Sequence, residues 1–253
     1  MKKNVLIIVF MGAWLFSTAQ AKPKVEWVSI PAGTFIMGSA PCEVGRNLEE
    51  TQHQVTVSAF KMSKYEVTYK QYDAYCEAIG REKVGDKDWG RGNRPVIFVS
   101  WQDATDFAEW MGCRLPTEAE WEYACRANTL TPFHTGNNLT TSQANFNGEY
   151  PYNGNAKGEY RGQTTPVGLF APNAFGLHDM HGNVWEYCSD WYAPYSHEAQ
   201  TDPKGPKTGE KHPIRGGSFG HYNTAARSRS AYRTSVTSDE RHDTVGIRLV
   251  SSD

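Results

Sequence analysis

After residue 21 the sequence has no apolar stretch long enough to cross a lipid bilayer, so no membrane-spanning segment is predicted. It also lacks a strong excess of either charge, because 26 lysines and arginines stand against 28 acidic residues. Nucleic-acid-binding proteins normally carry clustered basic residues, so we expect no nucleic-acid partner. Long helical periodicity is scarce too, which argues against a helical bundle.

The first 21 residues have the pattern of a secretory signal peptide. Two lysines at positions 2–3 precede an almost unbroken apolar run at 5–16, and Ala19-Gln20-Ala21 matches an A-x-A cleavage site. No cysteine follows the run, so a lipid anchor is not expected. We predict cleavage near Ala21 and a periplasmic or secreted product. Loss of two lysines from a chain of net charge −2 leaves about −4.

Cysteine is present in an odd number, which limits disulfide bonding. The five are Cys42, Cys76, Cys113, Cys125 and Cys188. In an oxidising compartment at most two disulfides form and one thiol is left over, and the sequence alone does not pair them. None lies in a C-x-x-C motif, so neither a zinc ribbon nor a thioredoxin-like site is expected.

Turn formers and aromatic residues dominate the rest of the chain. The 23 glycines, 13 prolines, 13 tyrosines, 11 phenylalanines and 8 tryptophans are typical of a loop-rich α+β domain. Residues 22–253 are of a length that forms one large domain or two small ones. Because no linker or internal repeat interrupts them, we predict a single domain.

Three helices are predicted from their N-terminal caps. Thr68 precedes YKQYDAYCEAI, which Gly80 ends, and Ser100 precedes WQDATDFAEWM. Thr117 precedes EAEWEYACR, with Glu120 in the reciprocal position of a capping box.

Strands are predicted from alternation. Residues 25–38 alternate and turn at 31–33, which predicts a hairpin, and residues 53–68 are also strand-like. Residues 95–99 form a short apolar run typical of a strand. Residues 128–176 have little periodicity, and so long a loop is normally functional or held by something such as a metal. Short strands separated by turns are predicted in WEYCSDWY, HPIRGGSF, AARSRSAYR and VGIRLV.

Seven phrases occur in order along the chain: GTFIMGS (33–39), EVT (66–68), PVIFVSWQDA (95–104), RLPTEAEWEYACR (114–126), TTPVGLFAPNAFGLHDMHGNVWEYCSDWY (164–192), IRGGSF (214–219) and VGIRLV (245–250). Together they resemble the sulfatase-modifying-factor family, which has the fold of the formylglycine-generating enzyme. The resemblance covers the chain from about Val25 to Val250. It implies a compact, loop-rich α+β fold, distantly similar to C-type lectin domains, with bound calcium.

The copper chemistry of this family needs two thiolates shortly after the R-G-G-S phrase. Two soft sulfurs hold Cu(I) linearly, and one exchanges with the substrate thiol. Here RGGSFGHYNTAARSRSAYR (215–233) contains no cysteine. His221 falls at the first thiolate position, and the second falls near Tyr222 to Ala226. The resemblance therefore implies no formylglycine generation by that route. Family members without the pair include iron-dependent sulfoxide synthases and a pyoverdine-maturation protein, so iron or copper stays an open alternative.

The stretch HDMHGNVWEY (178–187) admits a transition-metal site or a calcium loop. H-x-x-H places both imidazoles on one face only in a helix, and Gly176 and Gly182-Asn183 disfavour a helix. We prefer calcium, whose ligands are carboxylate and carbonyl oxygens. The resemblance implies one site with the Asp179 side chain and the backbone oxygens of Met180, Gly182 and Val184. It implies a second with Asn145, Phe146, Glu159 and the Arg161 carbonyl. The alternative is a turn capped by Asp179 without a metal.

Two functions from different classes remain open. One is an oxidoreductase that acts on a peptide, protein or small metabolite without the two-cysteine copper mechanism, for which the catalytic candidates are His221, Ser218 and Arg215. The other is a non-catalytic, calcium-stabilised module that binds a peptide or glycan. Formylglycine generation through Cys188 is a third, weaker idea. The simpler interpretations are a surface histidine at 221 and structural ion pairs for Arg215, Arg227, Arg229, Arg233 and Arg248. The oligomeric state is not predicted.

Overall fold

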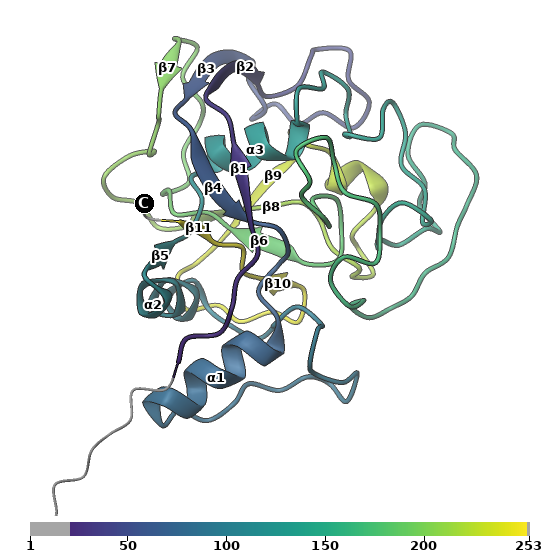
Figure 1. Cartoon of the computed structure of the whole chain (residues 1–253). Helices are drawn as coiled ribbons and strands as arrows, with labels where there is room; N and C mark the ends of the chain where they lie inside the picture. Colours follow the sequence, from purple (N-terminus) through teal and green to yellow (C-terminus); the bar gives the residue numbers. More distant parts are fainter. Residues whose placement is uncertain (1–20, 252–253) are drawn as a thin grey trace, which may run out of the picture.

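A computed structural model describes residues 21–251, so the expected signal peptide lies outside the described residues except for Ala21. Three small sheets and three helices form the regular part of the molecule, and long teal and green loops gather on one side of it (Figure 1). The predicted α+β class is confirmed. Within residues 21–251, no helix has the length and apolarity that a membrane crossing needs.

Each sheet combines strands that are distant in sequence. The first has the order β1 (Trp27–Ile30), β4 (Phe60–Ser63), β11 (Val250–Ser251) and β5 (Cys113–Arg114). The second has the order β10 (Val245–Gly246), β6 (Trp185–Tyr187), β8 (His212–Arg215) and β9 (Arg233–Val236). The third has the order β2 (Gly33–Met37), β3 (His53–Val57) and β7 (Gln200–Thr201).

The predicted hairpin over residues 25–38 is wrong. β1 pairs antiparallel with β4, and β2 pairs antiparallel with β3, so the turn at 31–32 moves the chain from one sheet to another. Alternation reports which face of a strand is buried, but it does not report which strand lies beside it. The local pattern therefore predicts that β1 and β2 are strands, but it does not predict that they pair with β4 and β3.

All three predicted helix starts are confirmed. In α1 (Tyr69–Ile79), α2 (Trp101–Met111) and α3 (Glu118–Arg126), the cap side chain accepts the N3 backbone N–H and the N3 side chain accepts the cap N–H. The α1 and α2 helices end at left-handed Gly80 and Gly112. These are local interactions within four residues, which is why the sequence predicts them well.

Two of the predicted strands are absent. Residues 95–99 form no strand, because Phe98 adopts a left-handed φ of 59° that interrupts extended backbone. Residues Ala225–Ser228, within the predicted AARSRSAYR strand, form a 3₁₀ turn, η1. The prediction of an irregular segment over 128–176 is confirmed, since no helix or strand of the described chain lies between α3 and β6.

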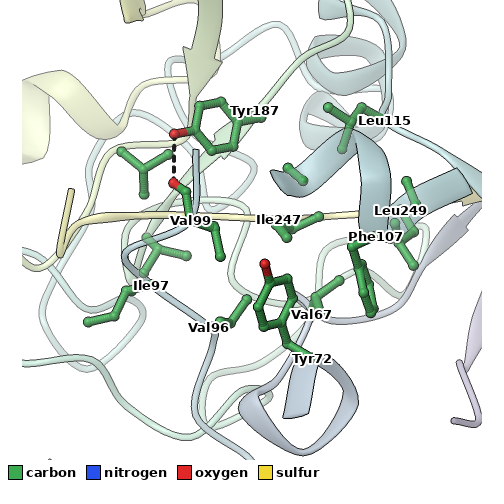
Figure 2. Packing of buried hydrophobic residues seen from close by; sticks show 14 of the residues in the cluster. Val67, Tyr72, Val96, Ile97, Val99, Phe107, Leu115, Tyr187, Ile247 and Leu249 are labelled. Carbon is green, nitrogen blue, oxygen red and sulfur yellow. Dashed lines mark hydrogen bonds between the residues drawn. The ribbon is translucent and has the colours of Figure 1, made fainter. Parts of the chain in front are cut away.

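The largest core cluster buries the irregular segment 95–99 beneath α1 and α2. Val96 and Val99 pack there with Ile247 and Phe107, and all four side chains are fully buried. The Tyr187 hydroxyl donates to the Val99 carbonyl at 3.0 Å (Figure 2). This bond gives the Val99 carbonyl the donor that a neighbouring strand would otherwise provide, so the segment stays buried without joining a sheet.

Buried arginines connect the elements. Arg215, Arg229, Arg233 and Arg248 are nearly or fully buried, and each pairs with at least one buried glutamate, which supports the interpretation as structural ion pairs. Arg227 is exposed instead. Arg229 joins the end of η1 to the loop at 43–50, with its Nη1 2.6 Å from Glu43 Oε1 and its Nη2 2.7 Å from Glu50 Oε1.

Replacement of Arg229 by methionine should lower the free energy of unfolding by about 3–5 kcal/mol, because Glu50 would stay buried without its cation. Urea denaturation measures this change. The matched control is Arg227→Met, which removes an exposed charge two residues away and should change the free energy by less than about 0.5 kcal/mol. Equal effects of the two substitutions would contradict a structural role for the buried pair.

Candidate functional site

The HDMHG stretch is a turn of left-handed residues, not a helix. Asp179, Gly182 and Asn183 have φ values of 59°, 92° and 60°. The two histidines consequently have separate partners. His178 contacts the Phe170 carbonyl through Nδ1 at 2.7 Å. His181 donates from Nδ1 to the Ser228 carbonyl at 2.7 Å and accepts the His134 backbone N–H at Nε2, 3.0 Å away. Both nitrogens of His181 are engaged, so the pair is not arranged as a transition-metal site.

This turn supports the loop that follows β8. Gly182 N donates to the Gly216 carbonyl at 2.7 Å, and Phe219 N donates to the Asn183 carbonyl at 3.0 Å. Further along, the buried Trp185 indole donates to Asn223 Oδ1 at 3.1 Å. Residues 179–185 therefore hold residues 216–223 in place through these hydrogen bonds.

The paired glycines of the R-G-G-S phrase allow a close approach. Gly216 and Gly217 have φ values of 98° and 77°. A Cβ on Gly217 would lie 2.4 Å from Ser228 Oγ, and one on Gly216 would lie 3.1 Å from the Trp121 ring. The phrase therefore needs glycine both for backbone conformation and for packing.

An aromatic surface lies around His221. Tyr222 is 77% exposed, and its ring centroid lies 5.0 Å from that of the exposed His221, while the partly exposed Tyr160 ring lies 6.0 Å from it. Trp89, from the polar loop at 81–95, meets Phe219 edge to face at 5.2 Å. We call Tyr160, His221 and Tyr222 the His221 surface. Its residues come from two separate loops.

Several residues around this site have weak signals or none in the sequence. A tryptophan in an otherwise polar loop marks Trp89 as a residue with a packing partner. Asn147, which donates from Nδ2 to the His221 carbonyl at 2.9 Å, and Asn223 had no local signal, because their contacts are long-range.

Of the three catalytic candidates, only His221 reaches the surface. Arg215 is fully buried and donates to Glu118 at 2.9 Å and to Glu122 at 2.6 Å, which makes it a structural residue. Ser218 is also fully buried, and its Oγ accepts the Gly220 N–H at 3.2 Å. Among residues 21–251 no general base is hydrogen-bonded to the Ser218 hydroxyl, so the arrangement does not activate it as a nucleophile.

The cysteines lie elsewhere, and within residues 21–251 Cys42, Cys76, Cys125 and Cys188 are free thiols. Cys188 is fully buried, and burial, with the nearby negative charge of Glu118, raises the pKa of its thiol well above 9. The thiolate is the nucleophile in cysteine chemistry. Burial and a neutral thiol both argue against formylglycine generation through Cys188.

The first predicted calcium site has an oxygen that lacks a partner. Asp179 Oδ2 accepts the Gly168 N–H at 2.7 Å, but Oδ1 is buried without a hydrogen bond. Burial raises the pKa of Asp179, and burial and the Asp179 charge raise the pKa of neighbouring Glu66 well above its usual value. Two buried carboxyls and an unpaired oxygen suit a hard cation. No group of three or more His, Cys, Asp or Glu side chains in residues 21–251 could hold a metal, so backbone oxygens must complete any calcium shell.

The second predicted site is assembled less completely. Asn145 donates from Nδ2 to the carbonyl of Gln163 at 2.9 Å, which leaves its buried Oδ1 without a partner. Phe146 is a buried core residue. The exposed Glu159 side chain pairs with Arg161 at 2.9 Å, and no described contact joins either residue to Asn145. The unpartnered Asn145 Oδ1 fits a cation, whereas the Glu159 carboxylate pairs with Arg161 instead of contacting Asn145.

The buried histidine pair predicts acid lability. Burial lowers the pKa of His134 to about 4 and that of His181 well below 6.5. The unfolded chain therefore takes up protons below pH 6.5 that the folded chain does not, so stability is lost as pH falls through 6.5, by up to about 1.4 kcal/mol per pH unit for each histidine.

His134→Gln should remove one histidine's share of that slope between pH 6.5 and 4.5, because only the backbone N–H of residue 134 bonds to His181. Urea unfolding at several pH values measures it. His197→Gln, at an exposed histidine, serves as the control and should keep the wild-type slope. An unchanged slope in His134→Gln would show that this histidine is not the source.

Comparison with known proteins places this geometry in a family. Residues 13–253 match the family described as the Sulfatase-modifying factor enzyme 1-like domain. The bovine formylglycine-generating enzyme is 32% identical over 284 residues, covering 90% of this chain and 75% of that protein. The Streptomyces coelicolor enzyme is 42% identical over 278 residues, covering 88% of each.

A solved structure agrees with the sequence comparison. PvdO from Pseudomonas aeruginosa is similar with a TM-score of 0.73 and 32% identity, over 88% of this chain and 93% of that one. The family match, the sequence identities and the fold lead to one conclusion: this chain belongs to the sulfatase-modifying-factor family, and its domain is formylglycine-generating-enzyme-like.

Proposed function

We propose that this chain is a calcium-stabilised binding protein whose His221 surface takes a peptide or glycan. The observation that carries the proposal is the exposed His221 between Tyr160 and Tyr222, on a loop held from beneath by residues 179–185. Aromatic rings offer large contact area at a low cost in conformational entropy, and a rigid loop limits the ordering cost of binding.

The copper route is not part of this proposal. Residues 215–233 contain no cysteine, and one imidazole does not replace two soft thiolates that hold Cu(I) and exchange with a substrate thiol. An aromatic surface with a single exposed histidine supports recognition more directly than it supports that oxidation.

A second candidate is an oxidoreductase-type activity on a peptide or small metabolite by another route. The observation in its favour is 42% identity to the Streptomyces coelicolor formylglycine-generating enzyme over 88% of each chain. The two candidates share a binding surface and differ in whether the bound molecule is oxidised.

The test is selection of ligands from a randomised 12-residue peptide library and a glycan array with the chain from residue 22 onward. We expect ligands whose affinity falls at least about tenfold in the double variant Tyr160→Ala/His221→Ala, because two contacts of the surface are lost. His197→Ala, at an exposed histidine outside this surface, should bind as wild type. Ligands that bind the double variant equally well would place the site elsewhere.

An oxygen electrode then separates the two candidates. Oxygen uptake that depends on the selected ligand and is lost in Tyr160→Ala/His221→Ala would support the oxidoreductase. Saturable binding without uptake, in protein supplied in turn with iron and with copper, would support the binding protein.

Calcium is the proposed structural cofactor. Asp179 with the carbonyls of Met180, Gly182 and Val184 would hold one ion, and Asn145 Oδ1 would anchor another. The two orphan buried oxygens support this assignment, one in each place. The signal-like N-terminus suggests export, and extracellular calcium is abundant enough for sites of ~10⁻⁴–10⁻³ M affinity.

Calcium at 1 mM should raise the melting temperature by about 5–10 °C if both ions bind with dissociation constants near ~10⁻⁴ M, and a chelator should reverse the shift. Calorimetric titration should find two sites in the wild type. Asp179→Ala should remove one and Asn145→Ala the other, with Asn155→Ala, at a non-ligand asparagine, as the control. Two sites in every variant, or none in the wild type, would contradict the assignment.

A further inference from the structure

A cavity of about 390 Å³ lies between α3, β7 and the segment 190–206. Its walls are mostly apolar or aromatic, and they include Met37, Ala119, Trp191, Pro194, Tyr195 and Pro206. No residue of the His221 surface lines it. The cavity is the size of a small organic molecule, so the polar groups in its wall determine what it can accept.

One acidic group in this wall lacks a counter-ion. Asp190 is only 7% exposed, and its Oδ2 accepts the Glu118 N–H at 2.7 Å. No cationic side chain of residues 21–251 forms an ion pair with its carboxyl. Burial and the negative charge of Glu118 raise the pKa of Asp190 to about 7. A carboxyl in this position gains most from a ligand that brings a positive charge.

The other charges around the cavity are already matched. Glu118 accepts from Arg215 at 2.9 Å and from Arg233 at 2.9 and 2.7 Å, so each of its two oxygens has a cationic partner. Arg215 is further neutralised by Glu122 at 2.6 Å. Lys204 lines the rim and is exposed to solvent, where its charge is screened. His53 is turned to the Thr51 carbonyl at 3.1 Å.

We propose that this cavity binds a small organic amine, with the protonated nitrogen on the Asp190 carboxyl and the apolar body against Trp191 and the proline-lined wall. A charge-assisted hydrogen bond to a nearly buried carboxylate is strong. The site is separate from the proposed function and does not depend on the His221 surface.

Three probes of one shape and different charge test this site: 2-phenylethylamine, the neutral 2-phenylethanol and the anionic 3-phenylpropanoate. Calorimetry at pH 8 should rank the amine at least about tenfold tighter than the alcohol, with the acid weakest, because only the amine brings a positive charge to Asp190. Asp190→Asn, which keeps an oxygen for the Glu118 N–H, should reduce the amine to the affinity of the alcohol. Glu198→Gln, an exposed acid on the adjoining segment, should leave all three affinities unchanged.

A second variant keeps the test decisive if Asp190→Asn is poorly folded. Ser196→Lys places a competing ammonium in the cavity wall and should weaken amine binding at least about fivefold, while the circular dichroism spectrum stays that of the wild type. An amine that binds no tighter than the alcohol, or folded Asp190→Asn or Ser196→Lys protein with wild-type amine affinity, would overturn the proposal.

Discussion

The buried contact between Arg215 and the glutamates of α3 is the interaction on which the rest of the structure depends. Arg215 ends β8, and its guanidinium reaches Glu118 and Glu122, one helical turn apart. Arg233 on β9 shares Glu118. One helix face is thereby joined to two strands by nearly buried charges. Because the loop with His221 starts at Arg215, this anchorage also sets where the candidate site begins.

A second set of anchoring contacts comes from HDMHGNVWEY (178–187), the stretch whose two histidines suggested a transition-metal site. Its left-handed residues allow backbone N–H and C=O groups to point toward residues 216–219, and its Trp185 indole reaches Asn223. Glu186, the polar residue in the buried β6 strand, is paired with Arg248 and accepts the Trp121 indole N–H at 2.6 Å. The segment therefore has two roles. Its turn presents the unpartnered Asp179 Oδ1, which suits a cation, and its backbone and Trp185 support the loop that carries His221.

Sequence reasoning succeeded where the determining contacts are local or where motifs are long. The capping boxes at Thr68, Ser100 and Thr117 act within four residues, and the family motifs are specific enough to identify the fold. The β1–β2 hairpin failed because strand partners come from distant segments, and the 95–99 strand failed because a positive φ at Phe98 has no signature in an apolar run. At the site, His221 was found by motif position. Asn147 and Asn223 became visible only through contacts made across the fold, and Arg215 and Ser218 were candidates until their burial was known.

The free cysteines described above have a consequence for how the protein is made. Cys76, Cys125 and Cys188 are fully buried as thiols, so oxidants can reach them only while the chain is unfolded. In an exported chain, folding therefore competes with oxidation, and the native state is the protected form. The strand pairs of Val250 with Met62 and with Arg114 join segments more than a hundred residues apart, so their formation is slow relative to local helix formation. The fraction of correctly matured protein would then be decided by the relative rates of chain collapse and of mispaired disulfide formation, not by the stability of the finished fold.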